Sequence, residues 1–146
     1  MNRTQEIASR APKVLIVDDD PTVAKFLDDR CAAIGLNVQV ASNGLEALVK
    51  IRRDPPDVLI ADVRMPELDG LSLSWTLLEP GRRPIDVIVV SGYLDDETIE
   101  RCESFGALYA HKGPELWHTI RGAITSMFPH MSVEVDGPVL SRLRVS

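Results

Sequence analysis

The chain has 146 residues, a length that suits one domain with a single buried core. Hydrophobic residues make up 45% of the chain and charged residues 26%, a composition typical of globular proteins that argues against wholesale disorder. Sixteen lysines and arginines against 22 aspartates and glutamates give a net charge of −6, so we expect no direct nucleic-acid binding through a large cationic surface.

The ends of the chain and its cysteines indicate a soluble protein. No apolar run approaches the roughly 20 residues that span a bilayer, and the start lacks the apolar stretch of a secretory signal. We therefore expect a cytoplasmic protein without membrane insertion, built as a polar tail (1–12), a domain (13–128) and a C-terminal tail (129–146). Cys31 and Cys102 lie far apart in sequence, which favours two reduced, buried thiols over a zinc site or a disulfide.

Short apolar or β-branched runs alternate with segments of helical spacing throughout the domain. Nearly continuous apolar strands separated by helices predict a doubly wound α/β fold, because right-handed crossovers place helices on both faces of a parallel sheet. The five predicted strands are 14–17, 38–41, 58–61, 85–90 and 107–110.

The helix boundaries carry recognisable signals. Asp20 followed by Pro21 predicts the start of the first helix, and Gly35 predicts its end. Asn43 and Glu46 have the spacing of a capping box at the start of the second helix. We expect the remaining helices to begin near 69–70, at 95 or 96, and at 114.

Polar residues follow four of the five predicted strands. Ligand sites of open parallel sheets lie beyond the carboxyl ends of the strands, so these side chains are expected to meet at one edge. They are Asp18, Asp19 and Asp20 after the first strand, Asp62 after the third, Ser91 after the fourth, and His111 and Lys112 after the fifth. His111 should point away from Lys112, because side chains alternate along a strand.

This set of side chains suits phosphoryl transfer. Clustered carboxylates repel one another and favour a hard cation, for which Mg²⁺ is the best candidate. Lys112 and Ser91 can bind anionic oxygens, and a carboxylate can act as a nucleophile that becomes an acyl phosphate. Asp62 lies in the middle of the group and is the candidate nucleophile.

The sequence resembles the receiver domain of bacterial two-component response regulators from residue 13 to about 128. The resemblance implies a flavodoxin-like strand order of 2-1-3-4-5 and a stand-alone, single-domain regulator. The motifs that carry it, in order along the chain, are VLIVDDDP at 14–21, DVLIADVRMP at 57–66 with DG at 69–70, VVSG at 89–92 and YAHK at 109–112.

The resemblance also implies roles for three catalytic residues. Asp62 is the phosphoacceptor, and the phosphoryl group comes from a phosphohistidine on a sensor histidine kinase or a histidine phosphotransfer protein of a phosphorelay. Ser91 and Lys112 hold phosphoryl oxygens. The protein then catalyses only its own phosphotransfer and dephosphorylation, and is not otherwise an enzyme.

The implied metal site is the acidic pocket itself. Asp19 is expected to bind Mg²⁺ directly and Asp18 mostly through water, while Asp62 completes the carboxylate ligands. Arg64 is expected to contribute its backbone carbonyl.

A conformational switch is implied as well. In the family the hydroxyl residue, here Ser91, moves toward the phosphoryl group, and the aromatic residue of the fifth strand, here Tyr109, turns inward. The fourth helix, fifth strand and fifth helix then form the output face, which binds a downstream protein or a second copy of the chain. Gly113 departs from the family pattern, because it follows Lys112 where a proline is usual.

A second family offers an alternative. Residues 18–22 also fit the Asp-x-Asp-x-Thr signature of Mg²⁺-dependent phosphatases of the haloacid dehalogenase type. Asp18 would then be the nucleophile and Asp20 the acid-base, and Asp62 would have no role. A receiver-like interaction module without phosphate turnover is a third reading, which the complete set of polar residues disfavours.

Overall fold

A parallel five-stranded sheet organises the protein. The computed structural model describes residues 10–64 and 85–130. The strands lie in the order β2-β1-β3-β4-β5, which confirms the predicted order. Their bounds are β1 Lys13–Val17, β2 Asn37–Ala41, β3 Val58–Asp62, β4 Asp86–Ser91 and β5 Leu108–His111.

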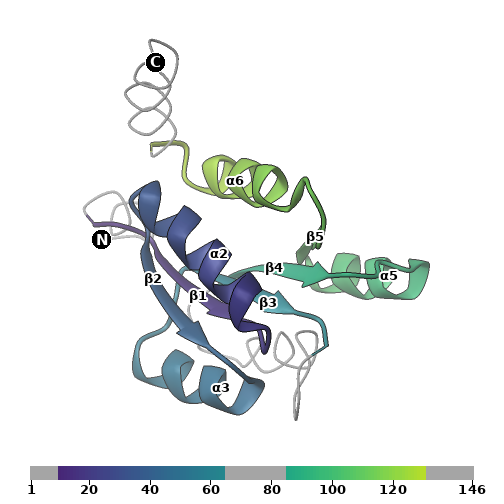
Figure 1. The fold of residues 1–146 in the computed structure, drawn as a ribbon, viewed down its shortest axis with the longest axis horizontal. Helices are drawn as coiled ribbons and strands as arrows, with labels where there is room; N and C mark the ends of the chain where they lie inside the picture. Colours follow the sequence, from purple (N-terminus) through teal and green to yellow (C-terminus); the bar gives the residue numbers. More distant parts are fainter. Residues whose placement is uncertain (1–9, 65–84, 131–146) are drawn as a thin grey trace.

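Helices cover both faces of this sheet (Figure 1). In the described ranges, α2 and α6 pack on one face, and α3 and α5 pack on the other. Their bounds are α2 Pro21–Ala33, α3 Gly44–Arg53, α5 Asp96–Phe105 and α6 Leu116–Met127. The helix predicted to begin near 69–70 lies outside the described residues.

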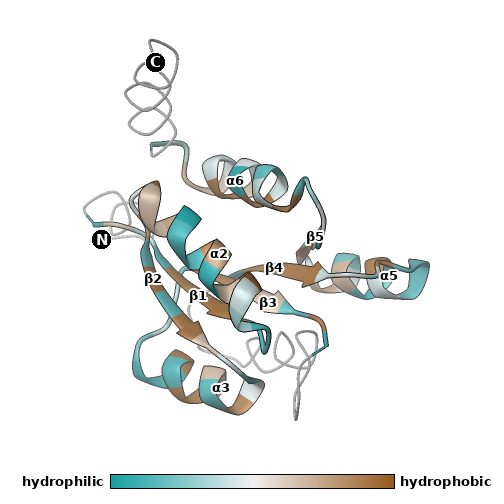
Figure 2. Ribbon diagram, in the orientation of Figure 1, coloured by the Kyte–Doolittle hydropathy of each residue, from teal (hydrophilic) through white to brown (hydrophobic). Residues whose placement is uncertain are grey.

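Alternate side chains of each strand feed the two apolar layers. Ile16 and Ile60 pack toward α2 and α6, where they meet Leu27 and Ile120, while Leu15 and Leu59 pack toward α3. The central strands are therefore apolar along almost their whole length (Figure 2). Each such side chain contributes about 1.5 to 3 kcal/mol by leaving water, which is why the strands appear in the sequence as unbroken apolar runs.

The first helix begins and ends as its sequence predicts. Asp20 caps α2, since its Oδ1 accepts from the backbone N–H of Thr22 at 2.9 Å, and Pro21 is the first helical residue. After the helix, Gly35 has a φ of 92°, a left-handed conformation that glycine adopts without steric cost.

Some other boundaries differ from the sequence expectation. At α3, Asn43 Oδ1 accepts from the backbone N–H of Glu46 at 2.8 Å, but the Glu46 carboxylate returns to the hydroxyl of Ser42 at 3.0 Å, so the predicted capping box is shifted by one residue. β5 lies one residue later than predicted, because the N–H of Ala107 donates to Cys102 at the end of α5.

α6 also begins later than predicted. It starts at Leu116 and not at Pro114, because the N–H of Leu116 closes a turn onto the carbonyl of Gly113 at 3.0 Å. The loop between β5 and α6 therefore includes Gly113 and Pro114.

Both cysteines are buried and free, as predicted. Burial raises the pKa of the Cys31 thiol to about 12, so that thiol stays protonated and unreactive at neutral pH. Within 10–64 and 85–130, no helix has the length and apolar character needed to cross a membrane.

A buried ion pair fastens the start of the described chain to the sheet. The side chain of Asp57, just before β3, is 0% exposed and accepts from both terminal nitrogens of Arg10, at 2.8 and 3.2 Å. The backbone N–H of Lys13 donates to the same carboxylate at 2.8 Å. The carbonyl of Pro12 also accepts from Asn37 of β2, so residues of the predicted N-terminal tail pack against the domain.

We expect Arg10→Ala to lower the free energy of unfolding by about 2 to 3 kcal/mol, because it removes two charge-assisted donors from a wholly buried carboxylate. Urea denaturation measures the change. Arg52→Ala, which removes an exposed arginine at the end of α3, is the matched control and should stay within about 0.5 kcal/mol of the wild type. Equal unfolding midpoints for the two variants would contradict the structural role of Arg10.

Candidate functional site

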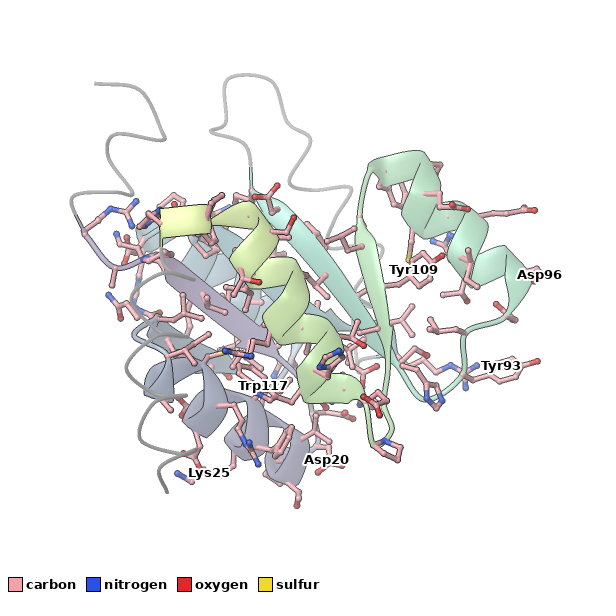
Figure 3. The ribbon with its side chains drawn as sticks, turned by 90° about the horizontal axis from the view of Figure 1, so that it is seen from above. Asp20, Lys25, Tyr93, Asp96, Tyr109 and Trp117 are labelled. Atoms are coloured by element: carbon pink, nitrogen blue, oxygen red, sulfur yellow. The ribbon has the colours of Figure 1, made fainter. Side chains whose placement is uncertain are left out.

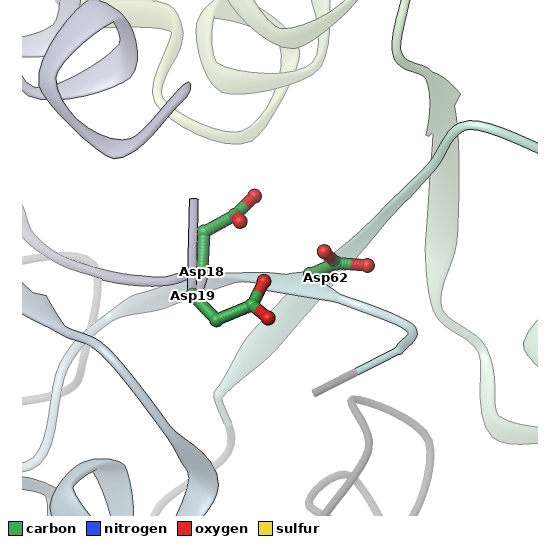
Figure 4. Close-up of side chains that lie close together, drawn as sticks. All are labelled: Asp18, Asp19 and Asp62. Atoms are coloured by element: carbon green, nitrogen blue, oxygen red, sulfur yellow. The ribbon is translucent and has the colours of Figure 1, made fainter. Parts of the chain in front are cut away.

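Three aspartates meet at the carboxyl edge of the sheet (Figure 4). Asp18 and Asp19 follow β1, and Asp62 is the last residue of β3, the strand that pairs with β1 in parallel. One carboxylate oxygen from each lies within 4.8 Å of the others. Asp18 and Asp62 are buried and Asp19 is exposed, so solvent reaches this group of carboxylates, which we call the acidic pocket, at Asp19.

Lys112 brings a positive charge into this pocket. Its Nζ lies 2.8 Å from Oδ2 of Asp62 and 3.0 Å from Oδ2 of Asp18. Because Lys112 follows the edge strand β5, its side chain extends past β4 to reach the ends of β3 and β1. One ammonium therefore links the ends of three strands.

The backbone fixes the other oxygen of both buried carboxylates. Oδ1 of Asp18 accepts from the N–H of Asp20 at 2.8 Å, and Oδ1 of Asp62 accepts from the N–H of Arg64 at 2.9 Å. These are Asx-type turns, in which an aspartate side chain orients the chain two residues on. The two carboxylates are therefore held in place before any ligand arrives.

Burial and the opposing charges shift the protonation equilibria of the pocket. Burial raises the pKa of Asp18, against the smaller lowering effects of the Asp20 backbone bond and of Lys112. Burial alone would lower the pKa of Lys112, but the hydrogen bonds and charges of Asp62 and Asp18 outweigh it and raise that pKa. The lysine therefore remains a cation at neutral pH.

The charge balance of this group favours a divalent cation. Three carboxylates face one ammonium, and the oxygen-only donor set is the kind that Mg²⁺ prefers, with waters completing its coordination. The residues present therefore fit the predicted metal. Asp18, Asp19 and Asp62 could hold it.

Ser91 lies at the same edge of the sheet but its hydroxyl is engaged elsewhere. The side chain is buried, donates to the carbonyl of Tyr93 at 2.8 Å and accepts from the N–H of Tyr93 at 3.0 Å. By strand alternation it lies on the side of Val87 and Val89, which pack toward α5. The structure thus brings Asp62 and Lys112 into contact and leaves Ser91 in a turn of its own.

The two tyrosines near the site are exposed. Tyr109, on β5 beside α5, is 36% exposed, and Tyr93, in the loop after β4, is 62% exposed (Figure 3). Tyr109 therefore occupies an outward position on the edge strand. Neither ring contributes to the carboxylate pocket.

His111 has a contact that the sequence did not reveal. Its Nε2 lies 3.1 Å from the carbonyl oxygen of Gly92, whereas the ammonium of Lys112 lies against Asp62 and Asp18. Gly113 lies against the ring, since a Cβ at that position would be 2.9 Å from Nδ1 of His111.

The geometry does not favour the phosphatase alternative. That reading pairs Asp18 with Asp20 and leaves Asp62 without a role. In the structure Asp20 caps α2 through Thr22, and Asp62 is the residue that joins Asp18 and Asp19.

Comparisons with known proteins agree with one another on the family of this chain. A family model described as a response regulator receiver domain matches residues 14–112. A probable transcriptional regulator (ycf27) of Porphyra purpurea is 37% identical over 84 residues, 58% of this chain and 35% of that protein. A gliding motility regulatory protein of Myxococcus xanthus is 37% identical over 112 residues, 75% of this chain and 14% of that protein. The chain thus spans about a third or less of the length of these relatives.

Solved structures agree with the sequence matches. A CheY-like receiver domain from Methanospirillum hungatei aligns with a TM-score of 0.72 and 25% identity, covering 85% of this chain and 98% of that one. The receiver domain of Francisella response regulator 1452 aligns with a TM-score of 0.63 and 36% identity, covering 69% of this chain and 84% of that one. With the acidic pocket at the strand ends, these matches show that the chain belongs to the response regulator receiver family, the phosphoacceptor module of two-component systems.

Proposed function

We propose that this protein is a phosphoacceptor in a two-component pathway or phosphorelay, with Asp62 as the residue that is phosphorylated. The donor is a phosphohistidine on a sensor histidine kinase or a histidine phosphotransfer protein. The observation that carries the proposal is the position of Asp62, whose carboxylate lies with those of Asp18 and Asp19 within 4.8 Å and 2.8 Å from Lys112 Nζ.

In the proposed reaction an oxygen of Asp62 attacks phosphorus, the bond from phosphorus to the imidazole nitrogen breaks, and the imidazole leaves with that electron pair. The N–H of Arg64 holds Oδ1 of Asp62, so the carboxylate is already oriented. Mg²⁺ would be held directly by Asp19, by Asp62 and by the backbone carbonyl of Arg64, and mostly through water by Asp18. Bound there, the ion supplies positive charge that stabilises the phosphoryl oxygens.

Lys112 is proposed to transfer its contact to the phosphoryl group. In the described structure Nζ is shared by Asp62 and Asp18. A phosphoryl group on Asp62 carries more negative charge than the carboxylate it replaces, so a flexible ammonium moves toward it at little cost. Ser91 would hold a second phosphoryl oxygen through its hydroxyl.

The output is proposed to be a change at the face formed by α5, β5 and α6. Movement of Ser91 toward the phosphoryl group, with inward rotation of Tyr109, would alter this face. Leu108 and Tyr109 are 46% and 36% exposed on β5, which supports an apolar contact surface for a downstream protein or a second copy. We place the receiver unit at residues 13–128 and its activity in the cytoplasm, limited to its own phosphotransfer and dephosphorylation.

Incubation with acetyl phosphate and Mg²⁺ is expected to add one phosphoryl group to the wild type and none to Asp62→Asn, because the amide lacks the nucleophilic oxygen. Intact-protein mass spectrometry measures the gain, and borohydride trapping locates the acyl phosphate. Asp20→Asn is the matched control, since residue 20 caps α2 outside the cluster, and should be labelled like the wild type. Turnover of a phosphomonoester that survives in Asp62→Asn but is lost in Asp18→Asn would instead support the phosphatase reading.

Added Mg²⁺ is expected to stabilise the wild type and to have little effect on Asp19→Asn. A ligand at 100 times its dissociation constant raises the free energy of unfolding by about 2.7 kcal/mol. Without Mg²⁺ the variant should be at least as stable as the wild type, because it removes one like charge from the cluster. Thermal denaturation with and without Mg²⁺ measures both effects, with Glu100→Gln on α5 as a control that keeps the response. An equal Mg²⁺ response in Asp19→Asn would be evidence against the metal site.

A further inference from the structure

The loops after β4 and β5 are joined by two contacts beyond the sheet. Ser91 and His111 are register partners at the ends of these strands, and the N–H of Lys112 donates to the carbonyl of Ser91 at 2.8 Å. The next carbonyl after that of Ser91 is the carbonyl of Gly92, and its partner is a side chain: Nε2 of His111 lies 3.1 Å from this oxygen. A carbonyl oxygen can only accept, so Nε2 carries the proton in this contact.

The peptide group held by His111 is the one that also binds Ser91. The carbonyl of Gly92 and the N–H of Tyr93 belong to the same planar peptide unit. His111 holds its oxygen at 3.1 Å, and the hydroxyl of Ser91 accepts from its N–H at 3.0 Å. The peptide is therefore fixed at both ends, and rotating it requires the His111 contact to break.

Gly113 provides the space for the His111 ring. A Cβ at position 113 would lie 2.9 Å from Nδ1 and 3.3 Å from Cε1 of His111, closer than such atoms pack. Among the described glycines, positive φ values occur at Gly35 and Gly106, so Gly113 is not required for a left-handed backbone. Alanine at 113 would therefore disturb the ring without straining the chain.

The hydroxyl of Ser91 cannot serve two acceptors at once. It has a single proton, which it donates to the carbonyl of Tyr93 at 2.8 Å. To donate to a phosphoryl oxygen on Asp62, it must give up this bond. Any contact that stabilises the 91–93 turn therefore opposes recruitment of the hydroxyl.

We propose that His111, seated against Gly113, is a positioning residue that holds the 91–93 turn in the conformation that keeps the Ser91 hydroxyl engaged with Tyr93. The inference rests on the proposed function, because it assigns Ser91 to a phosphoryl oxygen. Loosening the imidazole contact then favours the form that binds a phosphoryl group, without changing the carboxylates that bind the metal.

The test measures binding of beryllofluoride, a non-covalent mimic of the phosphoryl group, by isothermal titration calorimetry at saturating Mg²⁺. A single exposed hydrogen bond makes a modest net contribution, so His111→Ala should bind beryllofluoride about two- to fivefold more tightly than the wild type. Gly113→Ala should shift the affinity in the same direction, because its Cβ displaces the ring. The double variant should bind no more tightly than the stronger single variant, since both act through one contact.

Matched variants separate this effect from the loss of any imidazole or glycine. His118→Ala removes an exposed histidine of α6, and Gly122→Ala adds a Cβ that meets nothing within 4 Å. Both should bind beryllofluoride like the wild type. Mg²⁺ affinity without beryllofluoride should be equal in all variants, a result that general damage to the fold would not give.

The outcomes distinguish the two proposals. If the wild type shows no Mg²⁺-dependent beryllofluoride binding, or if Asp62→Ala binds it equally well, the proposed function fails. If the wild type binds but His111→Ala and Gly113→Ala bind equally or more weakly, the role of His111 is wrong. Additive effects in the double variant would also overturn it, because Gly113 would then act by another route.

Discussion

The ammonium of Lys112, shared by Asp18 and Asp62, is the contact on which the site depends. Two buried carboxylates side by side repel each other, and the interior amplifies that repulsion. The lysine lowers this cost, and at 2.8 and 3.0 Å it also joins the ends of β5, β3 and β1. Because an ammonium is a compact charge on a flexible side chain, it can offset the negative charge of the two carboxylates and still exchange one of them for an anionic ligand.

The charged cluster and the Ser91 hydroxyl have different partners at the carboxyl edge of the sheet. Asp18, Asp19 and Asp62 lie together beside the Lys112 ammonium, whereas the Ser91 hydroxyl binds the backbone of Tyr93. The hydrogen bond from the N–H of Lys112 to the carbonyl of Ser91 links the two groups. A movement of the loop after β4 would therefore also act on the backbone of Lys112.

The sequence predicts those features that depend on pattern, and misses those that depend on side-chain choice. The family resemblance predicted the strand order. The acidic residues that follow the apolar runs predicted that Asp18 and Asp62 meet at one edge of the sheet. Nothing local, however, says that the Glu46 carboxylate turns to Ser42, or that the hydroxyl of Ser91 binds the backbone of Tyr93. Such hydrogen bonds depend on the rotamer that each side chain adopts, and that choice depends on the surrounding loops.

The two aspartates at the ends of β3 show how partners decide the role of one residue type. The side chain of Asp57 is 0% exposed and accepts hydrogen bonds from both terminal nitrogens of Arg10, a bidentate contact that fixes orientation as well as charge. Asp62 accepts from the backbone N–H of Arg64 through Oδ1 and from the Lys112 ammonium through Oδ2, and its neighbours Asp18 and Asp19 favour a further cation. The bidentate pair with Arg10 makes Asp57 structural, whereas the flexible Lys112 ammonium can exchange its contact for an anionic ligand, so that an oxygen of Asp62 becomes available to the proposed phosphotransfer.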